Sequence, residues 1–144
     1  MKVNLEDLKK LREQTSAGVA DCRLALEESK GDLKKATEIL RKKGIERAEK
    51  KSEREVKAGV VFSYIHHTGR VGSILSLACE TDFVAKTDDF QKLGKEIAMH
   101  LAATGSLDTP YIRDASKTIQ DLIKETIGKL GENIQIVDFK VLMI

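Results

Sequence analysis

Apolar residues in the first 44 positions recur at helical spacing and predict three short helices. Leucines recur every third residue between positions 5 and 11. A second apolar face begins at Val19 and is closed by Gly31, and a third ends at Gly44, because glycine commonly ends helices in the left-handed conformation. Helices this short are not stable alone, so we expect residues 1–44 to form one module in which the apolar faces pack together.

Residues 45–57 mix lysine, arginine and glutamate and predict a charged helical connector. Between positions 41 and 57, eight basic residues against four glutamates give a net charge of +4. A basic helix of this kind is compatible with binding along a nucleic acid backbone. The glutamates at helical spacing and the lack of an aromatic residue to stack on a base favour a solvated helix instead. We therefore predict no direct contact with nucleic acid.

Beyond the connector the hydrophobic period changes from helical to two, which predicts a β-hairpin with its turn at positions 67–70. The face that carries Leu75, Leu77 and Cys79 is expected to be buried. Gly72, in the second strand, indicates either a close approach of another part of the chain or a β-bulge.

Two longer amphipathic helices and a final strand follow the hairpin. The first helix is capped by Thr87 and closed by Gly105, and the second runs from about Ser116 to Gly131. The last strand changes its alternation after Ile136. This slip indicates either a β-bulge or a strand that is buried on both faces.

The predicted fold class is α+β, in three segments. Residues 1–44 form a three-helix module, residues 45–57 a basic helical connector, and residues 58–144 a core with a small antiparallel sheet in the order strand, strand, helix, helix, strand. Helices on one face leave the other sheet face open, together with an apolar strand end at positions 141–144. We therefore expect a homodimer formed through this surface.

Composition narrows the class of protein further. Hydrophobic residues at 41% and charged residues at 33% are typical of a soluble globular protein, and a net charge of +2 does not mark the whole chain as a nucleic-acid binder. No apolar run approaches the ~20 residues of a membrane span, and the chain begins without a signal peptide pattern, so we expect a cytoplasmic protein without membrane contact. Cys22 and Cys79 lie in apolar patterns, where cysteine packs as a small hydrophobic residue.

Histidines and carboxylates in this chain do not form a recognised catalytic or metal-binding motif. His66 and His67 are adjacent in a predicted strand, so we expect them to point to opposite faces and not to bind one metal ion. Asp82 lies near Glu80, but two carboxylates alone are a common surface feature. An enzyme that uses the two histidines and Asp82 is the weakest alternative, and we predict neither an active site for covalent chemistry nor a cofactor.

Residues 79–86, where the apolar strand stops and a helix starts, are the predicted functional site. A strand-to-helix joint holds side chains rigidly at a surface, so Asp82 and Phe83 are candidates for a probe that enters a partner. In the alternative interpretation, Thr81 or Asp82 caps the helix while Phe83 fills the core.

Several motifs follow one another along nearly the whole chain. In the helical module they are Leu11-Arg12, Asp21-Cys22-Arg23-Leu24-Ala25-Leu26, Gly31-Asp32 and Leu40-Arg41-Lys42-Lys43-Gly44. In the core they are Tyr64-Ile65-His66-His67, Arg70-Val71-Gly72, Cys79-Glu80-Thr81-Asp82-Phe83-Val84-Ala85 and Lys129-Leu130-Gly131-Glu132-Asn133-Ile134. In this order, the motifs resemble those of the translation elongation factor Ts family.

This resemblance implies a guanine-nucleotide exchange factor for elongation factor Tu, the GTPase that brings aminoacyl-tRNA to the ribosome. It implies that the helical module, similar to ubiquitin-associated domains, docks on the nucleotide-binding domain of the GTPase. It also implies a wedge that enters near the magnesium and phosphate site. The implied partner-binding residues are Thr81, Asp82, Phe83 and Val84 in the wedge, Arg12, Val19, Ala20 and Arg23 in the docking patch, and His66, Leu130 and Gly131 in the core.

Three features depart from the pattern of the family. Ser16 stands where the family usually has glycine, and Val19-Ala20 replaces a methionine-rich pair. Positions 105–116 take the place of a longer helical region in short members, whereas longer members carry two copies of the core. The alternative function is a binding-only adaptor, which would use the helical module and the basic connector without altering a bound nucleotide.

Overall fold

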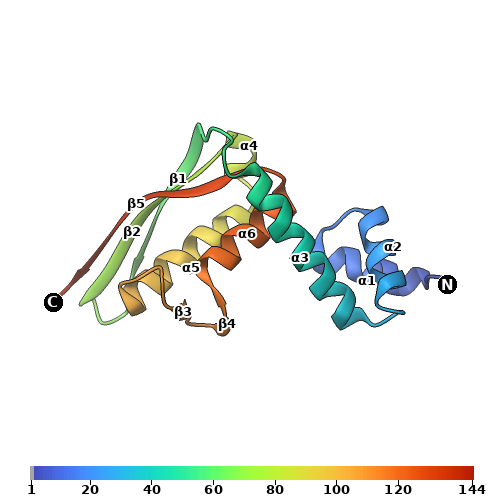
Figure 1. Cartoon of the computed structure of the whole chain (residues 1–144). Helices are drawn as coiled ribbons and strands as arrows, with labels where there is room; N and C mark the ends of the chain where they lie inside the picture. Colours follow the sequence, from blue (N-terminus) through green and yellow to red (C-terminus); the bar gives the residue numbers. More distant parts are fainter. Residues whose placement is uncertain (1) are drawn as a thin grey trace.

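Residues 2–144 are described by the computed structural model, in which a helical N-terminal module and an α+β core are joined by one long helix (Figure 1). The module contains α1 (Leu5–Thr15), α2 (Val19–Glu28) and the first half of α3 (Leu33–Lys51). Its helices share one hydrophobic cluster. The buried members of this cluster are Leu11, Cys22, Ala25, Leu26, Ala36 and Leu40.

Capping residues set where the helices of the module begin and end. The Asn4 side chain accepts a hydrogen bond from the backbone N–H of Glu6 at the start of α1. Asp32 accepts in the same way at the start of α3, from the backbone N–H groups of Lys34 and Lys35. α1 ends at Ser16, which has a φ of 58° in the left-handed region that glycine adopts more easily.

α3 is longer than the sequence pattern predicts. The helix was expected to end at Gly44, but it continues to Lys51, so the first half of the predicted connector belongs to α3. The expectation was wrong because Gly44 serves packing rather than chain reversal, since it lies against Gly128 of another helix. Although α3 has 19 residues, no helix in the described part of the chain is both long and apolar enough to cross a membrane.

The main sheet has three antiparallel strands in the order β1-β2-β5. They are β1 (Ala58–Ile65), β2 (Val71–Cys79) and β5 (Ile134–Met143). Ser76 lies opposite Asp138 and Leu77 opposite Ile136, so Val137 is the extra residue of a β-bulge. The predicted bulge is confirmed, and burial on both faces is wrong because 65% of Val137 is exposed.

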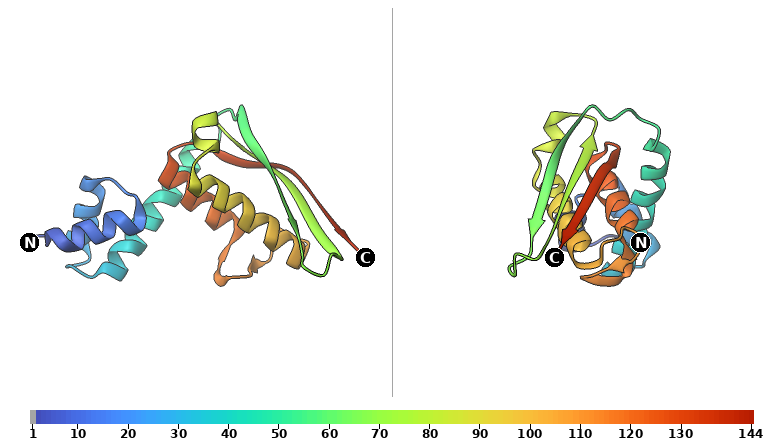
Figure 2. Two further views of the ribbon diagram at one scale, coloured as in Figure 1. Left: turned by 180° about the vertical axis from the view of Figure 1, so that it is seen from behind. Right: turned by 90° about the vertical axis from the view of Figure 1, so that its left-hand side faces the viewer.

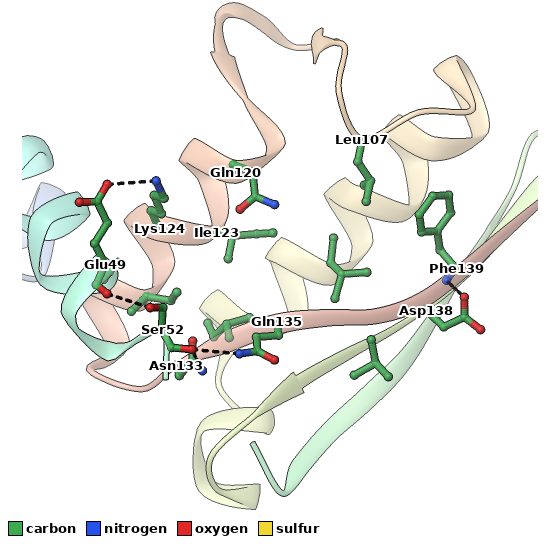
Figure 3. A pocket seen from close by; sticks show the side chains of 15 residues that line it. Glu49, Ser52, Leu107, Gln120, Ile123, Lys124, Asn133, Gln135, Asp138 and Phe139 are labelled. Carbon is green, nitrogen blue, oxygen red and sulfur yellow. Dashed lines mark hydrogen bonds and ion pairs between the residues drawn. The ribbon is translucent and has the colours of Figure 1, made fainter. Parts of the chain in front are cut away.

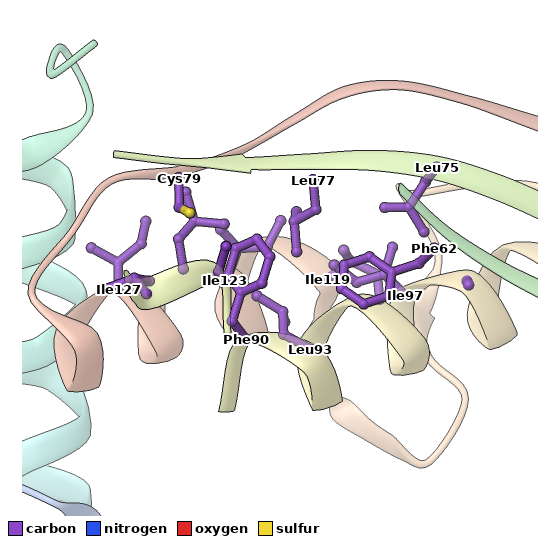
Figure 4. Close-up of a cluster of buried hydrophobic side chains, with 14 of the residues drawn as sticks. Phe62, Leu75, Leu77, Cys79, Phe90, Leu93, Ile97, Ile119, Ile123 and Ile127 are labelled. Atoms are coloured by element: carbon purple, nitrogen blue, oxygen red, sulfur yellow. The ribbon is translucent and has the colours of Figure 1, made fainter. Parts of the chain in front are cut away.

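Two helices cover one face of this sheet, α5 (Asp88–Thr104) and α6 (Ile119–Leu130), as Figure 2 shows. Their buried side chains meet those of β1 and β2 in the main hydrophobic cluster (Figure 4). Leu75, Leu77 and Cys79 are all buried there, which confirms the predicted inner face of the hairpin.

A small hairpin connects α5 to α6. It consists of β3 (Pro110–Tyr111) and β4 (Asp114–Thr118), so the predicted start of a helix at Ser116 was wrong. α6 begins at Ile119 because Thr118 and Asp121 form a reciprocal capping box just before it.

The other face of the main sheet is not covered by any helix of the described chain (Figure 2). Apolar side chains from all three strands lie on it. Those with large exposed fractions are Val61 at 63%, Ile65 at 68%, Ile74 at 49% and Leu142 at 76%. We call this surface the outer face.

Candidate functional site

The predicted wedge lies where β2 ends and the one-turn helix α4 (Asp82–Ala85) begins. Thr81 is the N-cap of α4, and its side-chain oxygen accepts a hydrogen bond from the backbone N–H of Val84 at 3.3 Å. Val84 and Ala85 are buried in the core, with 6% and 4% of their surface exposed. A cap on one side and two core side chains on the other therefore hold this turn.

Phe83 points away from the core, and 83% of its surface is exposed. Asp82 is exposed as well. The structure thus combines the helix cap of one interpretation with the exposed Asp-Phe pair of the other, and the idea that Phe83 fills the core is wrong. Val84, also among the predicted partner contacts, is buried in the free chain, and its side chain anchors α4 inside the protein.

Glu132 fixes the start of the wedge from another part of the chain. Its carboxylate accepts one hydrogen bond from the backbone N–H of Thr81 at 2.9 Å and a second from the Thr81 hydroxyl at 2.8 Å. In return, the Glu80 carboxylate accepts a hydrogen bond from the backbone N–H of Asn133 at 2.8 Å. The neighbouring residues Glu80 and Thr81 are therefore joined to the neighbouring residues Glu132 and Asn133 by hydrogen bonds in both directions.

Asn133 extends this network to the end of α3. Its side-chain amide donates to the carbonyl oxygens of Ser52 at 3.3 Å and Arg54 at 2.8 Å. Arg54 also forms an ion pair with Glu80 at 3.8 Å. Sequence reasoning did not assign a role to Glu80, Glu132 or Asn133, although they lie in two of the motifs that resemble the family.

Leu130 and Gly131, two of the predicted core contacts, lie just before this network. Both are half-buried. Gly131 ends α6 in the left-handed conformation with a φ of 78°, and its N–H donates to the carbonyl of Ile127 at 2.8 Å. This turn directs the chain towards Glu132, so these two residues lie beside the wedge in the same molecule.

The predicted docking patch lies on α1 and α2 of the helical module. Arg12, Val19, Ala20 and Arg23 are all exposed. Arg12 and Val19 also line a shallow hollow of about 430 Å³ together with Leu5, of which 78% is exposed. This surface offers an apolar centre with cationic side chains at its border.

His66 is far from the wedge within one chain. It follows the end of β1 that pairs Ile65 with Gly72, whereas the wedge follows the end that pairs Ala58 with Cys79. The rings of His66 and His67 lie only 4.1 Å apart between centroids, so the expectation that they point to opposite faces was wrong. Both residues lie beyond the last residue of the strand, where the alternation of a strand no longer applies.

Cys79, next to the wedge, is a structural residue. Its thiol is fully buried and donates a hydrogen bond to the carbonyl oxygen of Thr81 at 3.2 Å. Burial raises the pKa of this thiol, and the nearby Glu132 carboxylate raises it further. The side chain is therefore a protonated thiol at neutral pH and not a nucleophile.

A hollow of about 660 Å³ lies between α6 and β5 (Figure 3). Apolar side chains such as Ile123 and Phe139 line it, and Glu49 forms an ion pair with Lys124 at 3.2 Å at its border. None of the predicted partner-binding residues contributes to its lining. Within residues 2–144, no group of three or more His, Cys, Asp or Glu side chains is arranged to hold a metal ion.

Known proteins resemble this chain over almost its whole length. Residues 80–144 match a family model described as Elongation factor TS. Elongation factor Ts from Fervidobacterium nodosum is 38% identical over 190 aligned positions, which cover 96% of this chain and 96% of that protein. The protein of the same name from Thermotoga neapolitana is 39% identical, with 96% of this chain and 95% of that protein covered. The one from Aquifex aeolicus is 44% identical over 94% of this chain and 51% of its own length.

The alignments also show how this chain differs in length. The alignment with the Fervidobacterium protein has 190 positions, 46 more than the 144 residues of this chain. At least that many positions of the relative therefore have no counterpart here. In this structure the connection between α5 and α6 is closed by the short β3-β4 hairpin, whose Arg113 forms an ion pair with Glu96 of α5 at 2.7 Å.

Proposed function

Because this chain belongs to the elongation factor Ts family, it acts as a nucleotide-exchange factor for the GTPase elongation factor Tu, and we propose that the exposed pair Asp82 and Phe83 drives the exchange. In this proposal the wedge enters between helices of the GTPase near its magnesium and phosphate site. GDP is released because the magnesium ligands are displaced, without a covalent step and without a cofactor.

The exposure of Phe83 is the observation that carries this proposal. Its aromatic ring is 83% exposed, and the turn that carries it is rigid. Binding to a partner therefore costs little further conformational entropy. Burying such a ring on a partner contributes roughly 2 to 3 kcal/mol. If that energy is available only in the GTPase conformation that holds GDP poorly, it weakens nucleotide affinity roughly 30- to 150-fold. Since coupling is reciprocal, GDP or GTP weakens the factor to the same extent and releases it.

The three sequence segments have separate tasks in this proposal. Residues 1–44, similar to ubiquitin-associated domains, dock on the nucleotide-binding domain of the GTPase through Arg12, Val19, Ala20 and Arg23. Residues 45–57 connect this module to the core, and residues 58–144 present the wedge with Leu130 and Gly131 beside it. The shallow, partly apolar patch on α1 and α2 supports this assignment because it suits a protein surface better than a small ligand.

Release of fluorescently labelled GDP from elongation factor Tu, followed by stopped flow, tests the role of the wedge. Phe83→Ala should slow release at least tenfold while leaving the melting temperature unchanged, since the ring makes little contact with its own chain. Ile112→Ala is the matched control, because Ile112 is also exposed, at 44%, but lies in the turn of the β3-β4 hairpin. An equal loss in both variants would reject the wedge.

The binding-only adaptor is the competing function, and the same experiment separates it. An exchange factor accelerates GDP release at substoichiometric amounts, whereas an adaptor binds the GTPase and leaves the release rate unchanged. The family membership of the chain favours the exchange factor. Its place of action is then the cytoplasm, with a protein partner and with neither nucleic acid nor membrane in direct contact.

A homodimer through the outer face is the second part of the proposal. Ile74 on the central strand and Leu142 on the edge strand are exposed at 49% and 76%, and burial of such apolar area favours association. Light scattering should give twice the 16.0 kDa mass of the chain, and Ile74→Lys should give the single mass. A single mass for the wild-type chain at micromolar concentration would contradict the dimer.

Dimerisation would also explain how His66 takes part. Because His66 and Phe83 lie at opposite ends of the sheet, one GTPase could meet the wedge of one protomer and the His66 of the other. Mixing Phe83→Ala chains with His66→Ala chains should then restore part of the exchange activity through heterodimers with one intact site. Absence of any rescue would count against this shared site.

A further inference from the structure

The long helix α3 crosses α6 without any side chain between the two backbones. Gly44 of α3 and Gly128 of α6 meet at this crossing. A Cβ atom on Gly128 would lie 2.7 Å from the Cα atom of Gly44 and 3.2 Å from its carbonyl carbon and oxygen. A Cβ atom on Gly44 would lie 3.7 Å from the Gly128 Cα atom, which is an ordinary contact distance. The crossing therefore has no room for a Cβ atom on Gly128 of α6, but it has room for one on Gly44 of α3.

Ion pairs bracket this crossing on α3. Arg41, before Gly44, pairs with Glu125 of α6 at 3.3 Å, and Glu49, after it, pairs with Lys124 of α6 at 3.2 Å. These exposed or partly exposed pairs contribute little energy each, but they define the direction in which the two helices cross. The buried side chain of Ala48, only 2% exposed, packs into the main hydrophobic cluster beside them.

Helix α3 packs against both the helical module and the core. Its first half packs in the helical module, and its second half packs on the core through the crossing (Figure 1). Arg47 forms two hydrogen bonds with the Asp21 carboxylate of α2, at 2.8 and 3.1 Å, so the module is also tied to the second half of α3. The angle and separation at the crossing thus set where the docking patch lies relative to the wedge.

We propose that the contact of Gly44 with Gly128 is a rigid joint, and that Gly128 is a positioning residue for nucleotide exchange. The joint holds the docking patch and the wedge at one separation, so that binding of the module presents Phe83 at a high effective concentration to its site. This inference rests on the proposed function for its effect on exchange, whereas the rigidity of the joint is a property of this chain alone.

Two alanine substitutions of the same kind test the joint. Gly44→Ala and Gly128→Ala both replace a helix-interior glycine, and each gains helix propensity to a similar extent. Gly44→Ala fits the existing space, so it should leave the crossing unchanged. Gly128→Ala must move α3 away from α6 by about 1 Å, because the obstacle is backbone and carbon atoms in this packing approach no closer than about 3.5 Å.

The distance between the module and the core is the first measurement, and it needs no GTPase. Spin labels on Lys10→Cys and Lys86→Cys, both exposed positions, report this distance by pulsed electron paramagnetic resonance. We expect a narrow distribution in the wild-type background and in Gly44→Ala, and a shifted or broader one in Gly128→Ala. The native Cys22 and Cys79 are buried and should not take up the label.

The concentration dependence of GDP release is the second measurement. Gly128→Ala should raise the half-saturating concentration about tenfold and change the rate at saturation less than twofold, since the wedge itself is intact. Because an unfolded fraction would also raise the apparent half-saturating concentration, circular dichroism must first show that Gly128→Ala is folded. Wild-type distances together with wild-type half-saturation in Gly128→Ala would overturn the proposal.

If circular dichroism shows that Gly128→Ala does not fold, the wild-type background decides. A broad distribution of distances between the labels on Lys10→Cys and Lys86→Cys in that background would overturn the rigid joint. If Phe83→Ala keeps full exchange activity, the proposed wedge fails, but the distance measurement still decides whether the joint exists.

Discussion

Thr81 donates two hydrogen bonds to the carboxylate of Glu132, one from its backbone N–H at 2.9 Å and one from its hydroxyl at 2.8 Å. The two residues are separated by 51 positions in the chain. This pair connects the N-cap of the wedge helix to the chain that follows α6. The exposed ring of Phe83 is therefore oriented by a contact that neither local segment provides alone.

Loss of this pair should impair exchange more than it impairs folding. Glu132→Ala leaves both donors of Thr81 without their partner, and we expect the free energy of unfolding to fall by about 1 to 2 kcal/mol, since the site is exposed to water. GDP release from elongation factor Tu should slow several-fold because Phe83 samples more orientations. Stopped-flow release and chemical denaturation measure the two effects separately.

Glu132→Gln and Glu55→Ala are the controls for that prediction. Glu132→Gln keeps one carbonyl acceptor and should lie between Glu132→Ala and the wild type. Glu55, with 78% of its side chain exposed and only Lys57 at 3.7 Å, should tolerate alanine without effect. Exchange rates that are equal in Glu132→Ala and the wild type would refute a role for the pair in positioning Phe83.

Replacement of Ser16 by glycine should stabilise the helical module. Ser16 has a φ of 58°, and a residue with a Cβ atom is strained in this region by about 1 kcal/mol, partly offset by the greater flexibility of glycine in the unfolded chain. We expect Ser16→Gly to raise the free energy of unfolding by about 0.5 kcal/mol. Thermal denaturation followed by circular dichroism measures the change.

Lys30 offers an independent check of the same argument, because it has a φ of 55° at the end of the next helix. Lys30→Gly should also raise the melting temperature. If both variants melt at lower temperature than the wild type, the left-handed strain at these positions is smaller than the entropic cost of glycine.

Substitution of Gly94 should be among the most damaging changes in the core. Gly94 lies in α5 directly beneath the ring of Phe62, and a Cβ atom there would overlap the ring atoms. Phe62 is itself buried, at 5% exposure, and cannot turn out of the way easily. We expect Gly94→Ala to reduce the free energy of unfolding by about 2 kcal/mol or more despite its better helix propensity.

A second substitution at Phe62 distinguishes steric overlap with its ring from other causes of the lost stability. Phe62→Leu shortens the side chain, so the double variant Gly94→Ala with Phe62→Leu should be more stable than the sum of the two single changes predicts. Denaturant titration of the four proteins gives this coupling energy. A coupling near zero would show that Phe62 is not the obstacle.

Acid should destabilise the fold through His100. This side chain is fully buried, accepts a hydrogen bond from the Ile112 N–H at its Nδ1 atom at 3.4 Å, and lies 3.0 Å from the Thr109 hydroxyl at its Nε2 atom. Burial lowers the pKa of His100 below its ordinary value. The neutral form is therefore favoured in the folded state, and stability is constant above the unfolded pKa of about 6.5.

Below that pH the unfolded chain binds a proton that the folded chain excludes, so the free energy of unfolding should fall by up to about 1.4 kcal/mol per pH unit. Denaturant titrations at pH 8, 7, 6 and 5 measure the slope. His100→Gln should flatten it, and His67→Gln, at an exposed position, should not. A slope in the wild type that persists unchanged in His100→Gln would assign the acid effect to other groups.

The arrangement of helices and strands was largely predictable because its signals are local. Thr87, Gly105 and Gly131 cap or end helices where the sequence pattern places them. The bulge at Val137 follows from a slip in alternation that any strand with one buried face must show. These features depend on a few neighbouring residues, so their positions are visible along the chain.

Elements whose bounds depend on distant contacts were predicted less well. Gly44 looks like a helix end in the sequence, but it lies within α3 because Gly128 of α6 packs against it. Ser116 looks like the start of a helix, but the β3-β4 hairpin and the capping box at Thr118 move that start to Ile119. In both cases a partner remote in sequence changes the role of a residue with several permitted conformations.

The amino-acid sequence was enough to identify the fold class and the family and to propose the Asp82-Phe83 pair as the site, since each depends on residue types in a linear order. It did not reveal that Phe83 is exposed while the adjacent Val84 is buried, or that Glu132 and Asn133 hold the wedge in place. Those properties arise from packing and hydrogen bonds between segments that are far apart in the chain. Such contacts form only when the whole chain is folded, and no pattern within one segment encodes them.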